Sequence, residues 1–260
     1  MVAKVSSYMH LLKLYYQLQF IEVIFGVLLV GSTLTAKLLF DLFLLFVSSH
    51  LMLYGGLYTI NDLRDIEEDR KDEHKRHRPL PSGRIRRRDA VIFATVLISL
   101  GLTIGYFYFG LSVFLVYVAL IILNILYTYV FKRIPFIELV GNVLTHPFRV
   151  ILGVLVAGGV IHYPILLAYL LTTFGFTCAR RQILRISKGS EHRPNMKYYT
   201  NIRMNFLEIV AFILIGIIST FDKTTNQVWY SLLLFIYFLS VFGMHFLSPV
   251  KNFFMKIYLR

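Results

Sequence analysis

The sequence has little charge and almost no cysteine. Charged residues make up 16% of its 260 residues, whereas a soluble globular domain carries about a quarter. The single cysteine, Cys178, cannot form a disulfide bond within the chain or build a cysteine-ligated metal site. Because Cys178 lies inside an apolar run, we expect it to be a small buried residue. These shortages exclude a disulfide-stabilised fold and leave the apolar runs as the main signal.

Long apolar runs are what the sequence has instead. Hydrophobic residues make up 57% of the chain, and many runs approach the roughly 20 residues that cross a hydrocarbon core of about 30 Å. The predicted fold is therefore all-α, a polytopic transmembrane helical bundle of about eight membrane helices around a central cavity. It is expected to form one domain over residues 1–260. Helices are expected near residues 11–33, 38–60, 90–109, 111–131, 137–160, 163–185, 204–221 and 228–248.

Positive charge is distributed unevenly along the chain, and this predicts its topology. The net charge is +13, and 24 of the 27 Lys and Arg residues lie near the termini or in the segments 61–88, 132–133 and 180–203. Cytoplasmic segments of membrane proteins carry such an excess. We therefore expect a plasma (inner) membrane protein with both termini and the active-site loops in the cytoplasm, and no nucleic-acid partner. The first run lacks a signal-peptide cleavage pattern and is expected to be a membrane helix; residues 249–260 are expected at the interface.

An acidic cluster follows the second predicted helix. If the helix continues, Asp62, Asp65 and Asp69 share an arc of about 60° on one face. Carboxylates this close repel one another, so a cation must compensate them. Mg²⁺ prefers oxygen ligands and is usually held by one or two carboxylates together with substrate phosphates. The sequence therefore predicts that these three residues bind Mg²⁺.

A basic stretch, Lys75-Arg76-His77-Arg78, follows the acidic cluster. A metal-bridged diphosphate needs both groups, because the metal takes some phosphate oxygens and Lys or Arg takes the rest. The alternative is a solvated charged loop in which the acids pair with Arg64, Arg70 and Lys71. The shared face and the position beside a membrane helix favour the binding site.

The stretch from Asn61 to Gly83 resembles the first signature of the UbiA superfamily of intramembrane prenyltransferases. The matching residues are Asn61-Asp62-x-x-Asp65-x-x-x-Asp69 and then Arg78-Pro79-Leu80-Pro81-Ser82-Gly83. Members of this superfamily bind an isoprenyl diphosphate through Mg²⁺ and move the prenyl group to an acceptor. The resemblance implies that Asn61, Asp65 and Asp69 are catalytic and that Lys75 and Arg78 bind the donor.

The segment after the sixth predicted helix departs from the superfamily, which usually has a second Asp-rich motif there. In this sequence the segment is basic, with Arg180, Arg181 and Arg185, and its one acid before Arg203 is Glu191. The first motif, Asn61 to Arg70 followed by Lys75-Arg76 and Arg78-Pro79, looks most like the decaprenyl-phosphate phosphoribosyltransferase branch, which also has basic residues in place of the second Asp motif. The donor of that branch is 5-phosphoribosyl diphosphate and its acceptor is a polyprenyl phosphate. Arg180 and Arg181 are then expected to bind the anionic acceptor.

Polar residues inside the membrane are further candidates. A polar stripe from Glu138 to Arg149 crosses the fifth predicted helix. Intramembrane ionisable residues usually face a cavity or a partner, so Arg149 is expected near a phosphate, with a structural Glu–Arg contact as the alternative. Tyr58, one turn before Asp62, is expected to line the cavity, or else to pack between helices.

The sequence thus predicts a Mg²⁺-dependent membrane transferase that displaces diphosphate from a phosphorylated donor and uses a lipid substrate. The favoured reaction moves phosphoribosyl to a polyprenyl phosphate. The alternative is a conventional prenyltransferase that moves an isoprenyl group from a prenyl diphosphate to an aromatic or glycerophosphate acceptor. Non-enzymatic alternatives are a cation transporter, which would place acids near mid-membrane, and a lipid-binding protein. The oligomeric state is left open.

Overall fold

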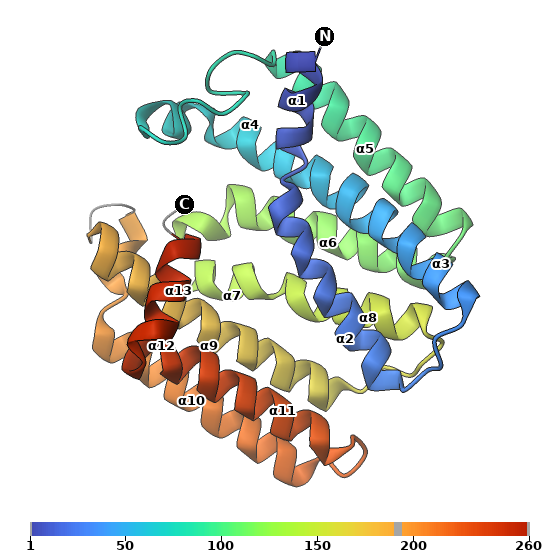
Figure 1. Cartoon of the computed structure of the whole chain (residues 1–260), viewed down its shortest axis with the longest axis vertical. Coiled ribbons are helices and arrows are strands. Elements are labelled where there is room, and N and C mark those ends of the chain that lie inside the picture. The colour runs from blue at the N-terminus through green and yellow to red at the C-terminus, as the bar shows by residue number, and fades with distance from the viewer. Residues whose placement is uncertain (1, 190–193, 259–260) are drawn as a thin grey trace. The chain divides into compact units, whose positions relative to one another are not determined.

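The computed structural model describes residues 2–189 and 194–258, and within these ranges the chain is helical with no strand (Figure 1). Among these described residues, six helices are long and apolar enough to cross a membrane, and a shorter apolar helix covers Leu14–Val30. The predicted all-α class is confirmed, but the count of about eight membrane helices is not. The spans are Ala36–Lys71, Arg87–Phe107, Leu111–Arg133, Ile137–Val156, Asn201–Phe221 and Gln227–Phe246.

The chain divides into two compact units, each described by itself. The first comprises residues 1–128 and 148–160. Its α-helices are α1 (Val2–Leu11), α2 (Ile21–Val30), α3 (Ala36–Leu45), α4 (Gly55–Lys71), α5 (Arg87–Phe107), most of α6 (Leu111–Tyr129) and most of α8 (Thr145–Val156). It also contains the 3₁₀ segment η1 (Leu14–Phe20) and the π-helical segment η2 (Phe46–Tyr54).

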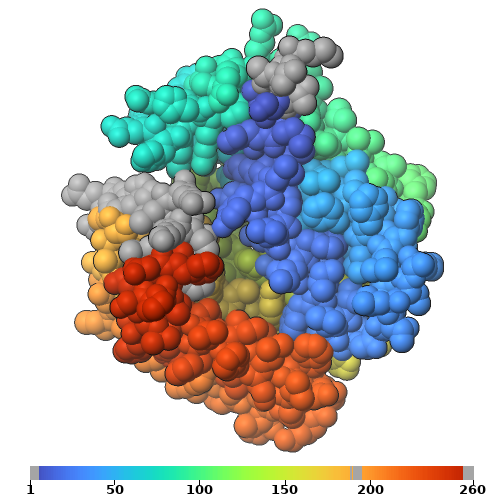
Figure 2. Space-filling model, in the orientation of Figure 1, coloured from blue at the N-terminus to red at the C-terminus, as the bar shows by residue number. Residues whose placement is uncertain are grey.

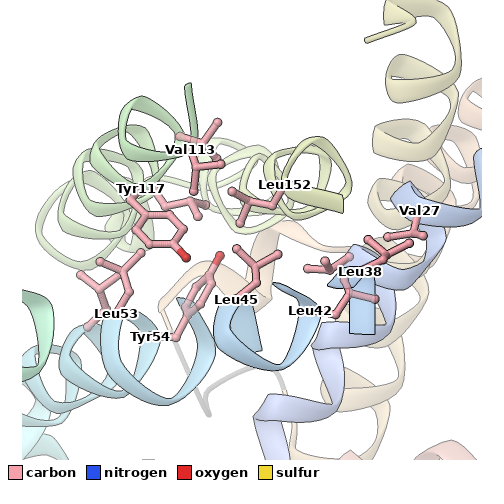
Figure 3. Close-up of a cluster of buried hydrophobic side chains, with 13 residues drawn as sticks. Val27, Leu38, Leu42, Leu45, Leu53, Tyr54, Val113, Tyr117 and Leu152 are labelled. Atoms are coloured by element: carbon pink, nitrogen blue, oxygen red, sulfur yellow. The ribbon is translucent and has the colours of Figure 1, made fainter. Parts of the chain in front are cut away.

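The core of the first unit lies among α2, α3, η2, α6 and α8. Tyr54 and Tyr117 stand between aliphatic side chains there (Figure 3), and the buried Tyr117 hydroxyl finds a partner in Ser48, 2.8 Å away. Helices α2 and α8 approach closely through glycine: a Cβ on Gly26 would lie 2.1 Å from the Val150 carbonyl oxygen. Larger residues at such positions would separate the two helices.

The second unit comprises residues 129–147 and 161–260. It contains η3 (Phe131–Arg133), α7 (Ile137–Val143), α9 (Tyr163–Lys188), η4 (Pro194–Tyr198), α10 (Asn201–Phe221), α11 (Gln227–Tyr237), η5 (Phe238–Phe242), α12 (Gly243–Phe246) and α13 (Ser248–Tyr258). Helices α9 and α10 pack along each other. Cys178 is fully buried beside Leu139 and Tyr199, as the sequence predicted.

Three predicted helices have different bounds in the structure. The first run breaks at Lys13, whose φ of 46° is left-handed. The second runs to Lys71 rather than 60, because the polar residues beyond Ile60 continue the helix. The fifth is two helices, α7 and α8. Pro147 explains the break, since its ring clashes with the carbonyl four residues earlier, and that residue, Val143, ends α7.

Candidate active site

The acidic motif lies on the last turns of α4, so the helix continues through it, which was the condition for the shared face of its acids. Asp62 and Asp69 are buried, with 7% and 4% of their surfaces exposed, and Asp65 is half-buried. Arg70 and Lys71 complete the helix in its last turn, where cations are favourable. The Asp72 carboxylate then accepts bonds from the His74 and Lys75 backbone N–H groups and turns the chain back.

The loop after α4 returns over the motif. Its apolar residues Leu80 and Ile85 are buried in a cluster with Ile66 of α4. The Arg70 side chain donates to the Pro81 carbonyl oxygen at 3.3 Å, and Gly83, with φ of 77°, allows the turn that follows. This packing holds the basic residues of the loop beside the acids of α4.

Each buried carboxylate of the motif has a basic partner. The Arg78 guanidinium lies 3.0 Å from the Asp69 carboxylate, and the Lys75 ammonium lies 3.5 Å from it. The Lys13 ammonium lies 2.6 Å from the Asp62 carboxylate. The side chains of Lys75 and Arg78 remain 30% and 34% exposed, so they can also reach an anion from solvent. The structure therefore brings Asp69 together with Lys75 and Arg78, and pairs Asp62 with Lys13, a base that the motif does not include.

Two other predicted residues stand next to these acids. Asn61 lies on α4, with its amide oxygen 3.5 Å from the Thr128 hydroxyl. The Tyr58 hydroxyl is 3.4 Å from Gln19, and its ring lies 5.5 Å from the Lys13 ammonium. Asn61 directly precedes Asp62 on α4, and Tyr58 lies one turn before Asp62, in the first turn of the helix.

The donor set suits Mg²⁺ with a phosphorylated ligand. Within residues 2–189 and 194–258, no group of three or more acid, histidine or cysteine side chains is arranged to hold a metal ion by itself. Mg²⁺ is usually held by one or two carboxylates plus substrate phosphates, so this arrangement fits the ion. Asp62, Asp65 and Asp69 would supply the hard oxygen ligands, a role that stays a prediction, and the exposed bases suit the phosphate oxygens.

Arg149 makes buried contacts within the first unit. Its guanidinium lies 3.1 Å from the Glu22 carboxylate, donates to the Tyr54 hydroxyl at 2.9 Å and covers the Tyr54 ring. Only 5% of the Arg149 side chain and 9% of the Glu22 side chain are exposed. These contacts agree with the structural alternative, and a phosphate-binding role for Arg149 stays a prediction.

Arg181 also makes a buried ion pair, in the second unit. Two of its guanidinium nitrogens donate to the Glu138 carboxylate, which accepts a further bond from the Tyr199 hydroxyl at 2.8 Å. Arg185, one turn later on α9, lies near the Tyr199 carbonyl oxygen and Asn201. Arg180 is half-buried. Acceptor binding by Arg180 and Arg181 stays a prediction, and Glu191 lies outside the described residues.

Sequence reasoning missed Lys13, Glu22 and Tyr199 as partners of predicted residues. Lys13 and Glu22 had left a signal, because they are charges within an apolar run, and such charges usually have a partner. Tyr199 gave no such signal in the sequence, since tyrosine is common between packed helices.

Comparisons with known proteins agree with the fold and with the predicted resemblance to the UbiA family. The profile of the UbiA prenyltransferase family matches residues 22–248. The chain is 51% identical over 51 residues to a protoheme IX farnesyltransferase of Synechococcus sp. (18% of this chain, 16% of the relative). It is 39% identical over 79 residues to a digeranylgeranylglyceryl phosphate synthase of Methanocaldococcus jannaschii (30% of this chain, 26% of the relative). The aligned parts thus span about a quarter or less of these relatives.

A solved structure covers nearly the whole fold. The UbiA homolog from Archaeoglobus fulgidus, bound to GPP and Mg²⁺, superposes with a TM-score of 0.76 at 18% identity, over 97% of this chain and 94% of that chain. At this identity the likeness shows the fold alone. The family profile, however, extends over most of the sequence and includes the whole of α4. The chain belongs to the UbiA prenyltransferase family.

Proposed function

We propose that the chain is a Mg²⁺-dependent membrane transferase that displaces diphosphate from a donor and transfers the remaining group to a lipid-soluble acceptor. The observation that carries this proposal is the end of α4. Buried Asp69 stands there between Lys75 and Arg78, and these two bases are about one-third exposed. A diphosphate needs this combination of hard anionic ligands for its metal and exchangeable cations for its own oxygens.

In this proposal Asp62, Asp65 and Asp69 hold the metal, which when bound neutralises the charge of the departing diphosphate. Lys75 and Arg78 leave Asp69 and donate to the diphosphate oxygens. Asn61 donates its amide N–H to the same group. The bond between the donor carbon and the diphosphate oxygen breaks, and a bond from that carbon to the acceptor nucleophile forms. The acceptor loses a proton if its nucleophile carries one, and diphosphate leaves.

Two donor classes fit this chemistry. The family relatives favour a prenyl diphosphate, since an Archaeoglobus fulgidus homolog binds GPP and a Synechococcus relative is a farnesyltransferase. The acceptor would then be an aromatic or a glycerophosphate compound. The basic sequence of α9 favours the second class, phosphoribosyl diphosphate with a polyprenyl phosphate acceptor, because arginines replace acids that would hold a second metal.

The test supplies purified protein with Mg²⁺, a polyprenyl phosphate, an aromatic acceptor and one donor labelled at a time. The donors are a prenyl diphosphate and 5-phosphoribosyl diphosphate. Transfer of either label into acceptor, with equimolar release of diphosphate, supports the transferase. The label that is transferred identifies the donor class. If neither label is transferred and neither donor binds, the proposed function is wrong.

The distribution of Lys and Arg supports an orientation with both termini and the loop after α4 on the cytoplasmic side. A cytoplasmic site would receive a water-soluble or membrane-bound diphosphate donor and a lipid acceptor from the bilayer. Cysteine labelling of variants such as Ser82→Cys in closed inner-membrane vesicles tests this, since Ser82 is exposed on the loop.

A further inference from the structure

Lys13 is the base that the motif does not predict. It lies 49 positions before Asp62 in the sequence, yet its ammonium is 2.6 Å from the Asp62 carboxylate. The two side chains are 16% and 10% exposed. The ammonium thus lies against a carboxylate to which the proposed function assigns the metal.

The backbone around Lys13 directs its side chain to this place. Lys13 interrupts the N-terminal segment between α1 and η1 with a left-handed conformation, φ 46° and ψ 55°. This conformation is uncommon for a residue with a Cβ. It is held by a bond from the Tyr16 backbone N–H to the Lys13 carbonyl oxygen at 2.8 Å, and by the Gln17 amide on the Leu12 carbonyl oxygen at 2.6 Å.

The N-terminal segment is also anchored to α4 by apolar packing. Leu11 is 1% exposed and lies in a cluster with Ile66 of α4 and Leu80 of the following loop. Helix α1 runs across α4 and α5 in Figure 1, and Figure 2 shows this segment at the outer face of the molecule. The position of Lys13 is therefore fixed by contacts that do not involve its charge.

Two tyrosine rings beside Lys13 can attract its ammonium when it is not bound to Asp62. It lies 5.5 Å from the centre of the Tyr58 ring and 6.0 Å from that of Tyr16, distances at which a ring attracts a cation. A lysine has a flexible four-carbon stem and a compact charge. Its ammonium can therefore leave Asp62 for a nearby anion while the backbone stays in place.

A divalent ion and an ammonium cannot both contact the same Asp62 oxygen, because the two cations repel each other. A metal arriving alone must either displace Lys13 from Asp62 or bind the same carboxylate against the repulsion of the ammonium, and both are unfavourable. A metal arriving with a diphosphate brings a new anion for the displaced ammonium. Lys13 thus opposes binding of the metal alone and favours binding of the metal together with a diphosphate.

We infer that Lys13 is an exchangeable counter-ion of the donor site, which neutralises Asp62 in the empty protein and moves to the donor diphosphate when the metal–diphosphate complex binds. This inference rests on the proposed function. It makes metal and diphosphate bind cooperatively, and because the coupling is reciprocal, each ligand strengthens the other by the same factor.

The test compares wild type with Lys13→Met, which keeps most of the stem and removes the charge. The probes are Mn²⁺ alone, followed by electron paramagnetic resonance of the free ion, and inorganic pyrophosphate titrated at saturating Mg²⁺. We expect Lys13→Met to bind Mn²⁺ about tenfold more tightly and pyrophosphate about tenfold more weakly, the size of one charged hydrogen bond.

Lys37→Met is the matched control. Lys37 also pairs with a buried aspartate, its ammonium 2.7 Å from the Asp41 carboxylate at the start of α3. Losing this pair should change neither titration by more than about twofold. Lys13→Gln serves as a second variant if Lys13→Met does not fold, and the same opposite changes are expected.

Changes of opposite sign in the two titrations support the inference. If Lys13→Met weakens the binding of both ligands or leaves both affinities unchanged, Lys13 is only a structural partner of Asp62. The inference is then overturned, while the proposed function stands. If wild type binds neither Mn²⁺ nor magnesium pyrophosphate, the proposed function and the inference fail together.

Discussion

The ends of α4 and α9 show two different uses of an acid–base cluster. At the end of α4 the acid is buried and the bases come from a loop, where Lys75 and Arg78 are 30% and 34% exposed. On α9 both partners are buried, since the Arg181 and Glu138 side chains are 5% and 4% exposed. Each cluster lies within its own unit of the chain.

The difference in exposure indicates a difference in role. Exposed bases can exchange a carboxylate for a ligand at little cost, because water solvates them on the way. A base buried beside an acid cannot leave it without separating two charges in a low dielectric. The cluster on α4 is therefore suited to binding, and the cluster on α9 to holding α7, α9 and Tyr199 together. Four substitutions test this comparison.

Asp69→Asn should have the largest effect. It removes a proposed metal ligand and the acid that gathers Lys75 and Arg78, so turnover should fall roughly a hundred- to a thousandfold, as for the loss of one key electrostatic group. The control is Glu67→Gln on the same helix, whose side chain is 65% exposed, and its turnover should stay within about threefold of wild type. Equal turnover in Asp69→Asn and Glu67→Gln would contradict the proposed metal site on α4.

Arg181→Met should act on stability instead. It leaves the Glu138 carboxylate buried without its cation, which costs about 3–5 kcal/mol. Unfolding titrations in mixed detergent micelles measure this loss. The double variant Glu138→Leu with Arg181→Met should regain most of it, because replacing both charges of a buried pair is often nearly neutral.

The double variant also separates the two roles considered for Arg181. If the pair is structural, the acceptor KM of the double variant should stay within about threefold of wild type. A stable double variant whose acceptor KM rises tenfold or more would show that Arg181 binds the acceptor, as the sequence alone predicted.

Tyr199→Phe should cost less, about 1.5–3 kcal/mol for one hydrogen bond to a charged group. Burial and the Glu138 charge raise the pKa of Tyr199 above its ordinary value of 10.0. A raised pKa means that the contribution of Tyr199 is present below pH 10 and is lost as the pH rises further. The difference in unfolding free energy between wild type and Tyr199→Phe should therefore shrink above pH 10. A difference that grows there would contradict the contact.

Arg78→Met should have the smallest effect, because Lys75 remains beside Asp69. We expect donor affinity to fall about tenfold, with stability nearly unchanged. Arg86→Met, at an exposed arginine of the same loop, should leave donor affinity unaltered. If both variants lower the donor affinity equally, the loop binds the donor through its total charge and not through Arg78.

Much of the fold could be predicted because membrane spans have a strong apolar signal. The exact ends of helices had weaker signals. Residues 61–71 are mostly polar, so hydropathy could not show that α4 continues through them. Pro147 did carry a signal for the break between α7 and α8. The π-helical turn at Phe46–Tyr54 depends on packing among distant segments and left no pattern in its own sequence.

The site could be predicted in part, because some of its residues are neighbours in the sequence. Asp62, Asp69, Lys75 and Arg78 are close in sequence, so their approach follows from one helix and one loop. The pairs Lys13–Asp62 and Arg181–Glu138 join residues 49 and 43 positions apart. Such pairs depend on how helices pack, and helical periodicity alone contains no such information.

The central claim is that α4 binds a diphosphate through a divalent metal. Isothermal titration of wild-type protein with inorganic pyrophosphate, in buffer with Mg²⁺ and again in buffer with a chelator, tests it most directly. The account predicts saturable binding with Mg²⁺, loss of binding in chelator, and loss of binding in Asp69→Asn under both conditions. Equal affinity with and without Mg²⁺ in wild type would contradict it.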